Sequence, residues 1–421
     1  MAQVKRVEPG SVEIRKLVLN TGLGAPIPLI GIATQLDIYE SIFQPYIIAD
    51  IIIVDGIGLL SKFPQIDEMT VDIEFSVIGL DETVSYTLAV LDRAGEKSEN
   101  QDKLVVYKMV CVSQEIDKRE AHKLIRYSGK ENISDAVINV LKTYIGTSKD
   151  YVCEPTNGIQ NIRPRSRKPF QLIDELRRAA LSIDNESHSY VFYEDKYGYK
   201  FVTIEKLIDD GVKKIGDKIY TYDSAVNVDV EGTNWRNILY RDVMVVGKAV
   251  KQLLLDAAKQ KVRNLNVTTA VQETYEKTEK ELSFKQLDKG GFTTTSERQA
   301  LLEEIVTMER AIVTSGIDTD SEDLYIPPEK IANLLIYFPN LISNVSRILV
   351  YGDPAVTVGN VIKCDIPEMD GLTNTKTKLS SSMSGNYLIT SLRHMIDLTA
   401  PPTYTQSLEI IKTGFGEGKP F

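Results

Sequence analysis

The first quarter of the chain is a succession of short apolar segments separated by turn residues. Between Ser11 and Ile116, runs rich in Val, Ile and Tyr alternate with Gly, Pro and Asp. β-Branched and aromatic residues favour strands, and frequent turn residues favour antiparallel neighbours. The pattern therefore predicts an antiparallel β domain with the strands VEIRKLVL, YIIADIIIV, MTVDIEFSVIG, SYTLAVL and LVVYKMVCVSQEI.

Two segments within this region need separate interpretation. DRAGEKSENQDK, residues 92–103, contains no Val, Ile, Leu or aromatic residue. It has little to bury, so we expect an exposed loop between the last two strands. YIIADIIIVDGIGLL is the most apolar run, but Asp50 and Asp55 interrupt it. A membrane span needs about 20 nearly uncharged residues, so we expect a buried strand and no membrane-spanning segment.

Residues 117–210 change to a helical period and then return to strands. NISDAVINVLKTYI predicts a helix with Asn132 as its N-cap. KPFQLIDELRRAALSI predicts a second helix that begins near Pro169. SYVFYEDKYGYKFVTIEKL predicts two strands joined by a polar turn at residues 195–198. The expected apolar face of the second helix consists of Leu172, Ile173, Leu176, Ala179, Ala180 and Ile183.

Strand patterns return in VNVDVEG, LYRDVMVVG and VSRILVYGDPAVTVGNVIKCDIP. The polar region between the second and third of these contains apolar residues at helical spacing, such as Leu301, Ile305, Met308 and Ile312. We interpret it as an insertion that splits a second β domain. The predicted organisation is a first β domain (1–116), an α/β domain (117–210), a second β domain (211–250 and 341–415), an insertion (251–340) and a flexible tail (416–421).

GNYLITSLRHMID, residues 385–397, fits a helix and a strand equally well by period alone. Pro401 and Pro402 follow it, and YTQSLEII comes next, which favours a hairpin. The segment also shares Tyr, Ile and Asp with YKMVCVSQEID, residues 107–117, at the same offsets. Either an internal duplication or a coincidence between two amphipathic strands explains these identities.

Motifs for chemistry are weak. VDGIGLLS places Gly56 and Gly58 after a strand, but Ser61 stands where a dinucleotide-binding loop needs a third glycine, and Pro64 interrupts a helix. We therefore expect a turn there. The sequence predicts no catalytic residue, no cofactor-binding residue and no metal site, because no recognisable motif contains His122, His188, His394, Cys111, Cys153 or Cys364.

The charge balance argues against a general nucleic-acid-binding protein. Lys and Arg number 49 and Asp and Glu 59, which gives a net charge of -10. The strongest basic cluster is RPRSRKP, and a solvated surface beside a helix is its simplest explanation. Its members are nevertheless candidates for an interface, namely Arg163, Arg165, Arg167 and Lys168.

The ordered motifs of the middle segment resemble the baseplate hub proteins of T-even-type contractile-tailed phages and, more distantly, the spike proteins of type VI secretion. GKENISDAVINVLKTYIG, KPFQLIDELRRAA and SYVFYEDKYGYKFVTIEKLI follow one another as a helix, a "PF..I..L.R.A" helix and an aromatic hairpin do in that family. The resemblance implies an α+β, mainly β fold. It comprises two tail-tube-like antiparallel β-barrel domains, an α/β domain between them and a partly helical insertion in the second barrel.

The resemblance also implies a function. It predicts a structural baseplate hub in the virion tail, assembled in the host cytoplasm, and not an enzyme. A homotrimer would form a pseudo-sixfold ring that joins the tail tube protein to the central spike protein, contacts neighbouring baseplate proteins and lets phage DNA pass without sequence-specific binding. Two alternatives remain, namely a tail-tip enzyme that cleaves cell-wall glycan with a carboxylate pair and the hub of a bacterial contractile injection device.

Overall fold

The fold is known from a computed structural model. It describes residues 10–22, 25–59, 69–78, 80, 82–99, 104–118, 129–162, 167–185, 187–215, 219–222, 236–245, 344–367, 379–380 and 383–412. The predicted insertion, residues 251–340, and the predicted tail, residues 416–421, lie outside these ranges.

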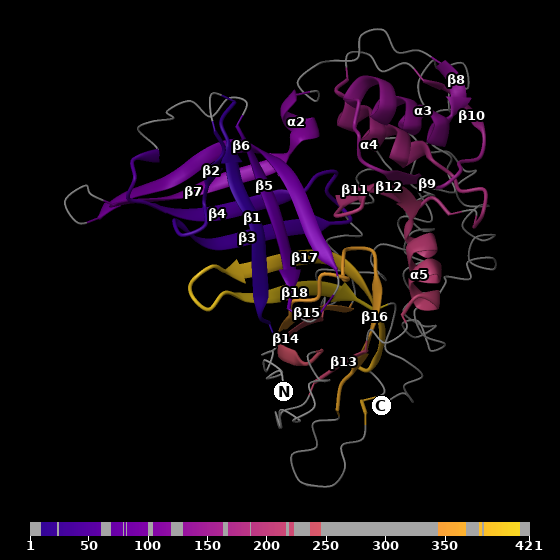
Figure 1. Ribbon diagram of the computed structural model, residues 1–421. Helices are drawn as coiled ribbons and strands as arrows, with labels where there is room; N and C mark the ends of the chain where they lie inside the picture. Colours follow the sequence, from indigo (N-terminus) through magenta and orange to yellow (C-terminus); the bar gives the residue numbers. More distant parts are fainter. Residues whose placement is uncertain are drawn as a thin grey trace, which may run out of the picture.

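One 13-stranded, mostly antiparallel sheet runs through the molecule (Figure 1). Among the described strands of this sheet, β13 and β16 are the one parallel pair. The predicted α+β, mainly β class is confirmed. The strand order is β14 (Ile238–Val245), β15 (Asn344–Tyr351), β18 (Thr403–Ile411), β17 (Gly385–Asp397), β3 (Ala33–Ser41), β4 (Ile48–Asp55), β7 (Leu104–Ser113), β6 (Thr83–Glu99), β5 (Thr70–Val77), β1 (Val12–Asn20) and β2 (Ile27–Pro28), with β16 (Val361–Asp365) on β17 and β13 (Ile219–Thr221) on β16.

β3 links the two halves of this sheet. Its outer edge pairs with β17 from Gln35 opposite Asp397 to Ser41 opposite Ser391. Its other edge pairs with β4. The sequence patterns did not predict β3, because ATQLDIYES contains only two large aliphatic residues and reads as a polar segment. Strands from the beginning and from the end of the chain therefore lie side by side.

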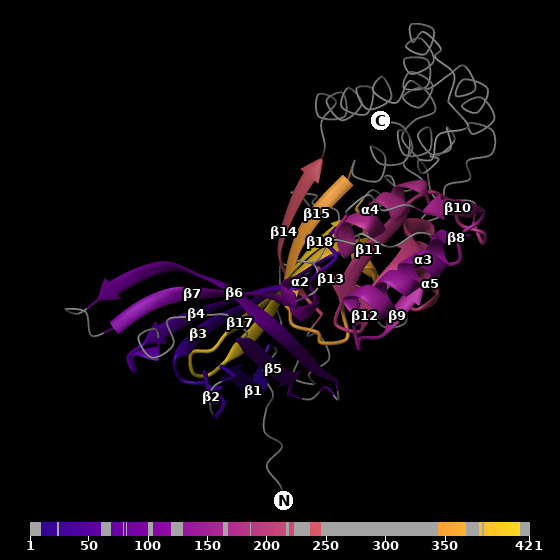
Figure 2. The ribbon, with the colours of Figure 1, turned by 90° about the horizontal axis from the view of Figure 1, so that it is seen from above.

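Two β cores share the β17–β18 hairpin. The first core is formed by side chains of β1 and β3–β7, and Ile396 and Tyr404 of the hairpin complete it. The second core contains Leu388, Leu392 and Leu408 of the same hairpin, packed with residues of β15 and β16. Figure 2 shows this yellow hairpin between the strands of the first core and the helices.

A third core belongs to the α/β part. Around it lie α3 (Ile133–Asn139), the π-helix η1 (Val140–Ile145), α4 (Pro169–Ala179) and the hairpin of β11 (Tyr190–Asp195) and β12 (Gly198–Thr203). The remaining elements are α2 (Gln114–Lys118), β8 (Gly129–Asn132), β9 (Tyr151–Cys153), β10 (Ile159–Ile162) and α5 (Ile204–Lys213).

The β11–β12 hairpin is buried on both faces because it serves two cores. Phe192 and Phe201 pack into the third core, whereas Val191, Tyr193 and Val202 pack into the second. Side chains of a strand point alternately to its two faces, so each core receives every second residue. This explains why SYVFYEDKYGYKFV is aromatic and apolar throughout.

Several local predictions are confirmed and others are corrected. Asn132 is the N-cap of α3, Pro169 opens α4, and a turn joins β11 to β12. Ile183 does not belong to the buried face of α4, because the helix ends at Ala179 and Ile183 is 56% exposed. Residues 204–213 form helix α5 and do not continue the strand, because the Thr203 hydroxyl caps the helix by accepting from the Lys206 amide.

The prediction of a loop at residues 92–103 is wrong for residues 92–99. They continue β6 and pair with β7 as far as Glu99 opposite Leu104. This antiparallel arm extends beyond the sheet (Figure 1). A projecting hairpin is held by backbone hydrogen bonds between its strands, which do not need large apolar side chains. The apolar pattern of the sequence therefore does not indicate this hairpin.

Candidate functional site: the junction between the cores

The carboxylate of Glu40 lies where the two β cores meet. Glu40 is on β3 and is 1% exposed. Its Oε1 accepts a hydrogen bond from the Tyr86 hydroxyl at 2.8 Å, and its Oε2 accepts one from the Thr357 hydroxyl at 2.5 Å. The amide of Val358 also donates to Oε2, at 3.4 Å. One carboxylate therefore binds a strand of the first core and a loop of the second.

Glu40 is held as a buried anion. Burial raises the pKa of Glu40, but the neighbouring His394 and the hydrogen bonds from Thr357 and Tyr86 outweigh this effect, so that the pKa lies below its ordinary value. Hydrogen-bond donors favour the charged form of a carboxyl group. The junction is therefore organised around a negative charge. Hydrogen-bond donors of the protein solvate this charge in place of water.

His394 lies next to Glu40 and is completely buried. Its Nε2 is 3.7 Å from Glu40 Oε1, and its Nδ1 is 2.6 Å from the Tyr404 hydroxyl oxygen. The sequence around His394 contains no evident acid–base partner. Its partner in the structure is Glu40, near the other end of the chain, and only the pairing of β3 with β17 brings the two together.

The hydrogen-bond chain continues into the second core through Gln406. Its Nε2 donates to the Tyr404 hydroxyl at 2.7 Å and to the Asp353 carbonyl at 3.0 Å. Its Oε1 accepts from the Asp353 amide at 3.0 Å. The Asp353 carboxylate pairs with Arg236 at 3.3 Å. Hydrogen bonds thus run from His394 through Tyr404 and Gln406 to the loop after β15, and His394 Nε2 lies 3.7 Å from Glu40 of β3.

This loop, Gly352–Asn360, is named the junction loop here. Two glycines allow it to fit closely. A Cβ on Gly352 would lie 1.9 Å from Cδ1 of Tyr404, and one on Gly359, whose φ is +77°, would lie 2.4 Å from the Tyr193 hydroxyl. The loop therefore packs against both the β17–β18 and the β11–β12 hairpins, and a larger residue at either glycine would collide with a buried ring.

Lysines fix the α/β part to the same junction. The Nζ atom of Lys196, in the β11–β12 turn, lies 2.5 Å from Glu82 Oε1 and also contacts the carbonyl of Pro354 in the junction loop. Tyr197 donates to the same Glu82 oxygen at 2.8 Å. Lys196 is nearly buried, so this contact excludes much of the solvent that weakens exposed ion pairs.

A second lysine contact lies beside α2. Lys149 Nζ is 2.7 Å from Glu115 Oε2 and 2.6 Å from Glu194 Oε1. Burial raises the pKa of Glu194 in spite of this lysine. Glu115 follows the first β core along the chain, whereas Lys149 and Glu194 belong to the α/β part. These charges join the two parts.

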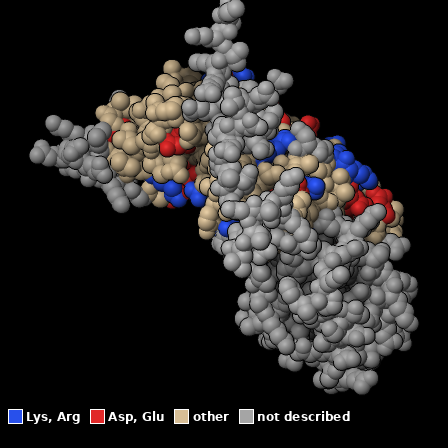
Figure 3. All heavy atoms as spheres, turned by 90° about the horizontal axis from the view of Figure 1, so that it is seen from below, with Lys and Arg blue, Asp and Glu red and all other residues tan. Residues whose placement is uncertain are grey.

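The predicted interface residues are only partly described. Arg163 and Arg165 lie outside the described residues. Arg167 is exposed and pairs with Glu175 at 2.6 Å. Lys168 is the N-cap of α4, and its amide donates to the Gln171 side chain at 3.3 Å. On the face in Figure 3, basic and acidic side chains of the described residues lie next to one another.

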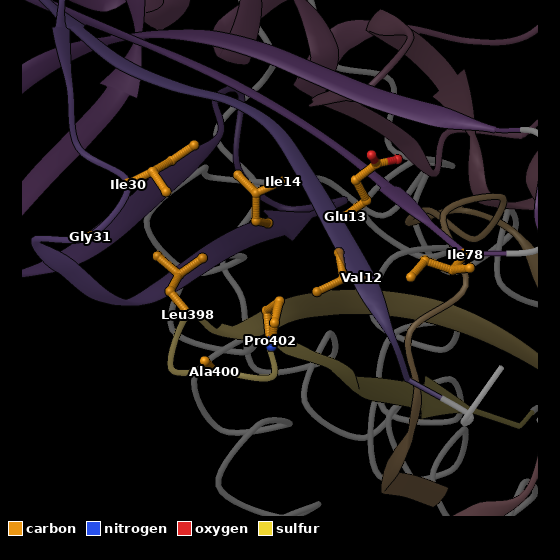
Figure 4. Close-up of a pocket in the computed structure, with 9 residues that line it drawn as sticks. All are labelled: Val12, Glu13, Ile14, Ile30, Gly31, Ile78, Leu398, Ala400 and Pro402. Carbon is orange, nitrogen blue, oxygen red and sulfur yellow. The ribbon is translucent and has the colours of Figure 1, made fainter. Parts of the chain in front are cut away.

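An apolar groove opens at the edge of β1 (Figure 4). Its volume is about 570 Å³. Ile30 and Ile78, which are 55% and 48% exposed, lie on it. The groove is further lined by Val12, Glu13, Ile14, Gly31, Leu398, Ala400 and Pro402.

The structure also describes the predicted turn after β4. The turn expected at VDGIGLLS is present at its start, where Asp55 accepts from the amides of Ile57 and Leu59 at 3.1 and 2.9 Å. Within the described ranges, His, Cys, Asp and Glu side chains do not gather in threes that could hold a metal ion. In the same ranges, no helix is long and apolar enough to cross a membrane.

No protein-family model and no curated protein matches the chain. Solved structures do match. The 43 kDa tail protein of prophage MuSo2 from Shewanella oneidensis aligns over 94% of this chain and 98% of its own, with a TM-score of 0.53 and 11% identity. A tail protein from Neisseria meningitidis MC58 aligns over 97% and 98%, with a TM-score of 0.51 and 9% identity. The chain has the fold of these tail proteins.

The resemblance to phage tail proteins predicted from the ordered motifs is thereby confirmed at the level of the fold. A component of the Escherichia coli type VI secretion system also aligns, over 97% of this chain and 79% of its own, at 9% identity. Its TM-score is 0.44.

Proposed function

We propose that the protein is a structural baseplate hub of a contractile phage tail. Three chains would form a pseudo-sixfold ring that joins the tail tube protein to the central spike protein and leaves a passage for DNA. The observation that carries the proposal is the tail-protein fold, together with two β cores that share one sheet within a single chain.

The geometry supports the proposed symmetry. A chain with two β cores can present two modules to a ring, so a threefold assembly would present six, which matches a sixfold tube. Such a ring needs the two modules of each chain to keep a fixed relation. The β3–β17 pairing and the contacts of Glu40, Gln406 and Lys196 supply this rigidity. The net charge of -10 would disfavour retention of DNA in a passage.

The oligomeric state tests this proposal directly. Light scattering of the purified protein should give three times the 47.1 kDa mass of one chain, and electron microscopy of the same fraction should show rings. A protein that stays monomeric over a wide range of concentration, and that binds neither the tube nor the spike protein encoded with it, would contradict the proposal.

The basic cluster is a proposed contact with a neighbouring baseplate protein. Arg163, Arg165, Arg167 and Lys168 would be replaced together by Glu, and we expect weaker capture of that neighbour with unchanged trimer mass. A variant with only Arg167 and Lys168 replaced by Glu is compared with a control in which Lys213 and Lys214, at the end of α5, are replaced by Glu, so that two charges are reversed in each. Equal losses in both variants would mean that overall charge, and not this cluster, determines binding.

The same assembly would suit a bacterial injection device. The two settings differ in what lies beside the gene, since capsid and terminase genes accompany a phage tail. For the glycan-cleaving alternative, several described carboxylates of the α/β part are held by neighbouring side chains. Glu154 is 1% exposed and accepts hydrogen bonds from Ser182, Asn185 and Thr203. We therefore place the enzyme second.

A further inference from the structure

The orientation of the Gln406 side chain is fixed by the backbone of Asp353. An amide side chain has one accepting and one donating end. The Asp353 amide can only donate and its carbonyl can only accept, and they lie 3.0 Å from Gln406 Oε1 and Nε2 respectively. The Nε2 group therefore faces the Tyr404 hydroxyl as a donor, at 2.7 Å.

This orientation determines the direction of the next hydrogen bond. The Tyr404 oxygen accepts from Gln406, so its own proton needs an acceptor. His394 Nδ1, at 2.6 Å, is the acceptor available within the described residues. A neutral imidazole accepts at one nitrogen and carries its proton on the other. The proton of His394 is then on Nε2, the atom that faces Glu40 at 3.7 Å.

We infer that His394 is an acid-sensitive catch, held as the neutral Nε2–H tautomer, whose protonation releases the junction loop. A second proton must go to Nδ1, because Nε2 already carries one. Tyr404 then loses the acceptor for its hydroxyl proton, and its oxygen faces donors on both sides. At the same time the new positive charge attracts Glu40. Acid thus strengthens the contact between His394 and Glu40 and weakens the contact from Tyr404 through Gln406 to Asp353, at the start of the loop.

The surroundings of His394 favour this selectivity. Facing the imidazole are Glu40 from β3, Tyr86 from β6 and Tyr404 from β18, with the Phe75 ring of β5 at 6.3 Å. Asp195 at the end of β11 is neutralised by direct contact with Lys200. The Asp353–Arg236 pair lies beyond Gln406. Glu40 is therefore the charge that a protonated His394 meets first.

The tautomer is tested by nitrogen NMR of protein labelled only at histidine. His188 provides an internal reference of the opposite kind, because its Nδ1 lies 3.0 Å from the Ala180 carbonyl and must carry a proton there. At pH 7.5 we expect His394 to be protonated at Nε2 and unprotonated at Nδ1. A proton on Nδ1 of His394 at this pH would overturn the inference.

The release of the loop is tested by hydrogen exchange with mass spectrometry across the titration of His394. After correction for intrinsic rates, peptides covering Gly352–Asn360 should lose protection by about fivefold, the effect of about one lost hydrogen bond. Peptides around His188 should not change in parallel. Unchanged protection of the loop while His394 titrates would refute the catch.

Two variants distinguish the catch from a non-specific loosening of the protein in acid. Tyr404→Phe removes the hydroxyl, so the loop should be less protected at every pH and should not respond to His394. Gln406→Met interrupts the hydrogen-bond chain one residue further on, between Tyr404 and Asp353, and keeps the Tyr404–His394 contact. It should also abolish the response of the loop to His394. A pH response that persists in a folded variant of either kind would show that another group causes it. This inference does not depend on the ring proposed above.

Discussion

Replacement of Glu40 tests whether the junction holds the two β cores together. In Glu40→Leu, the hydroxyls of Tyr86 and Thr357 and the amide of Val358 all lose their acceptor. A buried donor left unpaired costs about 1–3 kcal/mol. Three such donors give a loss of about 5 kcal/mol, allowing for partial relaxation of the loop.

Glu40→Gln keeps the shape and one oxygen. The hydroxyls of Tyr86 and Thr357 can rotate to suit an amide, so the main loss is the charge on the acceptor. Hydrogen bonds to charged groups contribute about 1 kcal/mol more than neutral ones. With two hydroxyl donors affected, we expect a loss of about 2 kcal/mol.

The assay is urea unfolding followed by circular dichroism at one fixed protein concentration, because the proposed trimer makes stability depend on concentration. Glu13→Gln is the matched control. Glu13 is exposed on β1, and its change should stay within about 0.5 kcal/mol. The reasoning fails if Glu40→Gln behaves like Glu13→Gln, or if the leucine variant is no less stable than the glutamine variant.

The pH dependence gives an independent check. The pKa of Glu40 is lower in the folded protein than its ordinary value. Its contribution to the free energy of unfolding is therefore fully present above the ordinary carboxyl pKa and is lost as pH falls through the lowered value. We expect the difference between the wild type and Glu40→Gln to shrink below about pH 4. A difference that stays undiminished below about pH 4 would contradict the assignment of the charge.

Two further substitutions and one activity assay have definite expected outcomes. Gly352→Ala should lower the free energy of unfolding by about 2–3 kcal/mol, because its Cβ would overlap the Tyr404 ring. Gly158 is the control position, because a Cβ there would enter open space and its φ is +83°. Gly158→Ala should cost only about 1 kcal/mol in the same unfolding assay. Lys196→Met should speed cleavage by proteinase K between the α/β part and the first core, because it removes the contacts with Glu82 and Pro354; cleavage as slow as in the wild type would contradict this role. A peptidoglycan zymogram should show no clearing, and clearing that a single Asp or Glu substitution abolishes would favour the enzyme.

Local features of the fold could be predicted from the sequence because they depend on local patterns. The period of KPFQLIDELRRAA and the position of Pro169 predict α4 correctly, and the aromatic runs predict the β11–β12 hairpin. Tyr107 and Tyr387, the first shared residues of the sequence echo, are both buried, one in each β core. Ile116 lies in a helix and Ile396 in a strand, so the echo does not extend through the segment.

The candidate site could not be predicted in the same way. Glu40 lies in a polar strand that no apolar pattern marks, and its contacts with Thr357 and His394 join residues far apart in the chain. The junction loop reads as a turn region, and its role depends on Gly352 meeting a ring from another strand. Pairing of distant strands determines these contacts, and one sequence contains no direct signal for it.

The hairpin shared by the two β cores has a consequence for synthesis on the ribosome. The first core lacks Ile396 and Tyr404 until residues 385–411 have emerged, although its other strands are made within the first 113 residues. A nascent chain must therefore keep this unfinished core soluble while more than 250 residues are added. Truncated chains would expose its apolar side chains, so only chains that carry the hairpin would be competent to assemble.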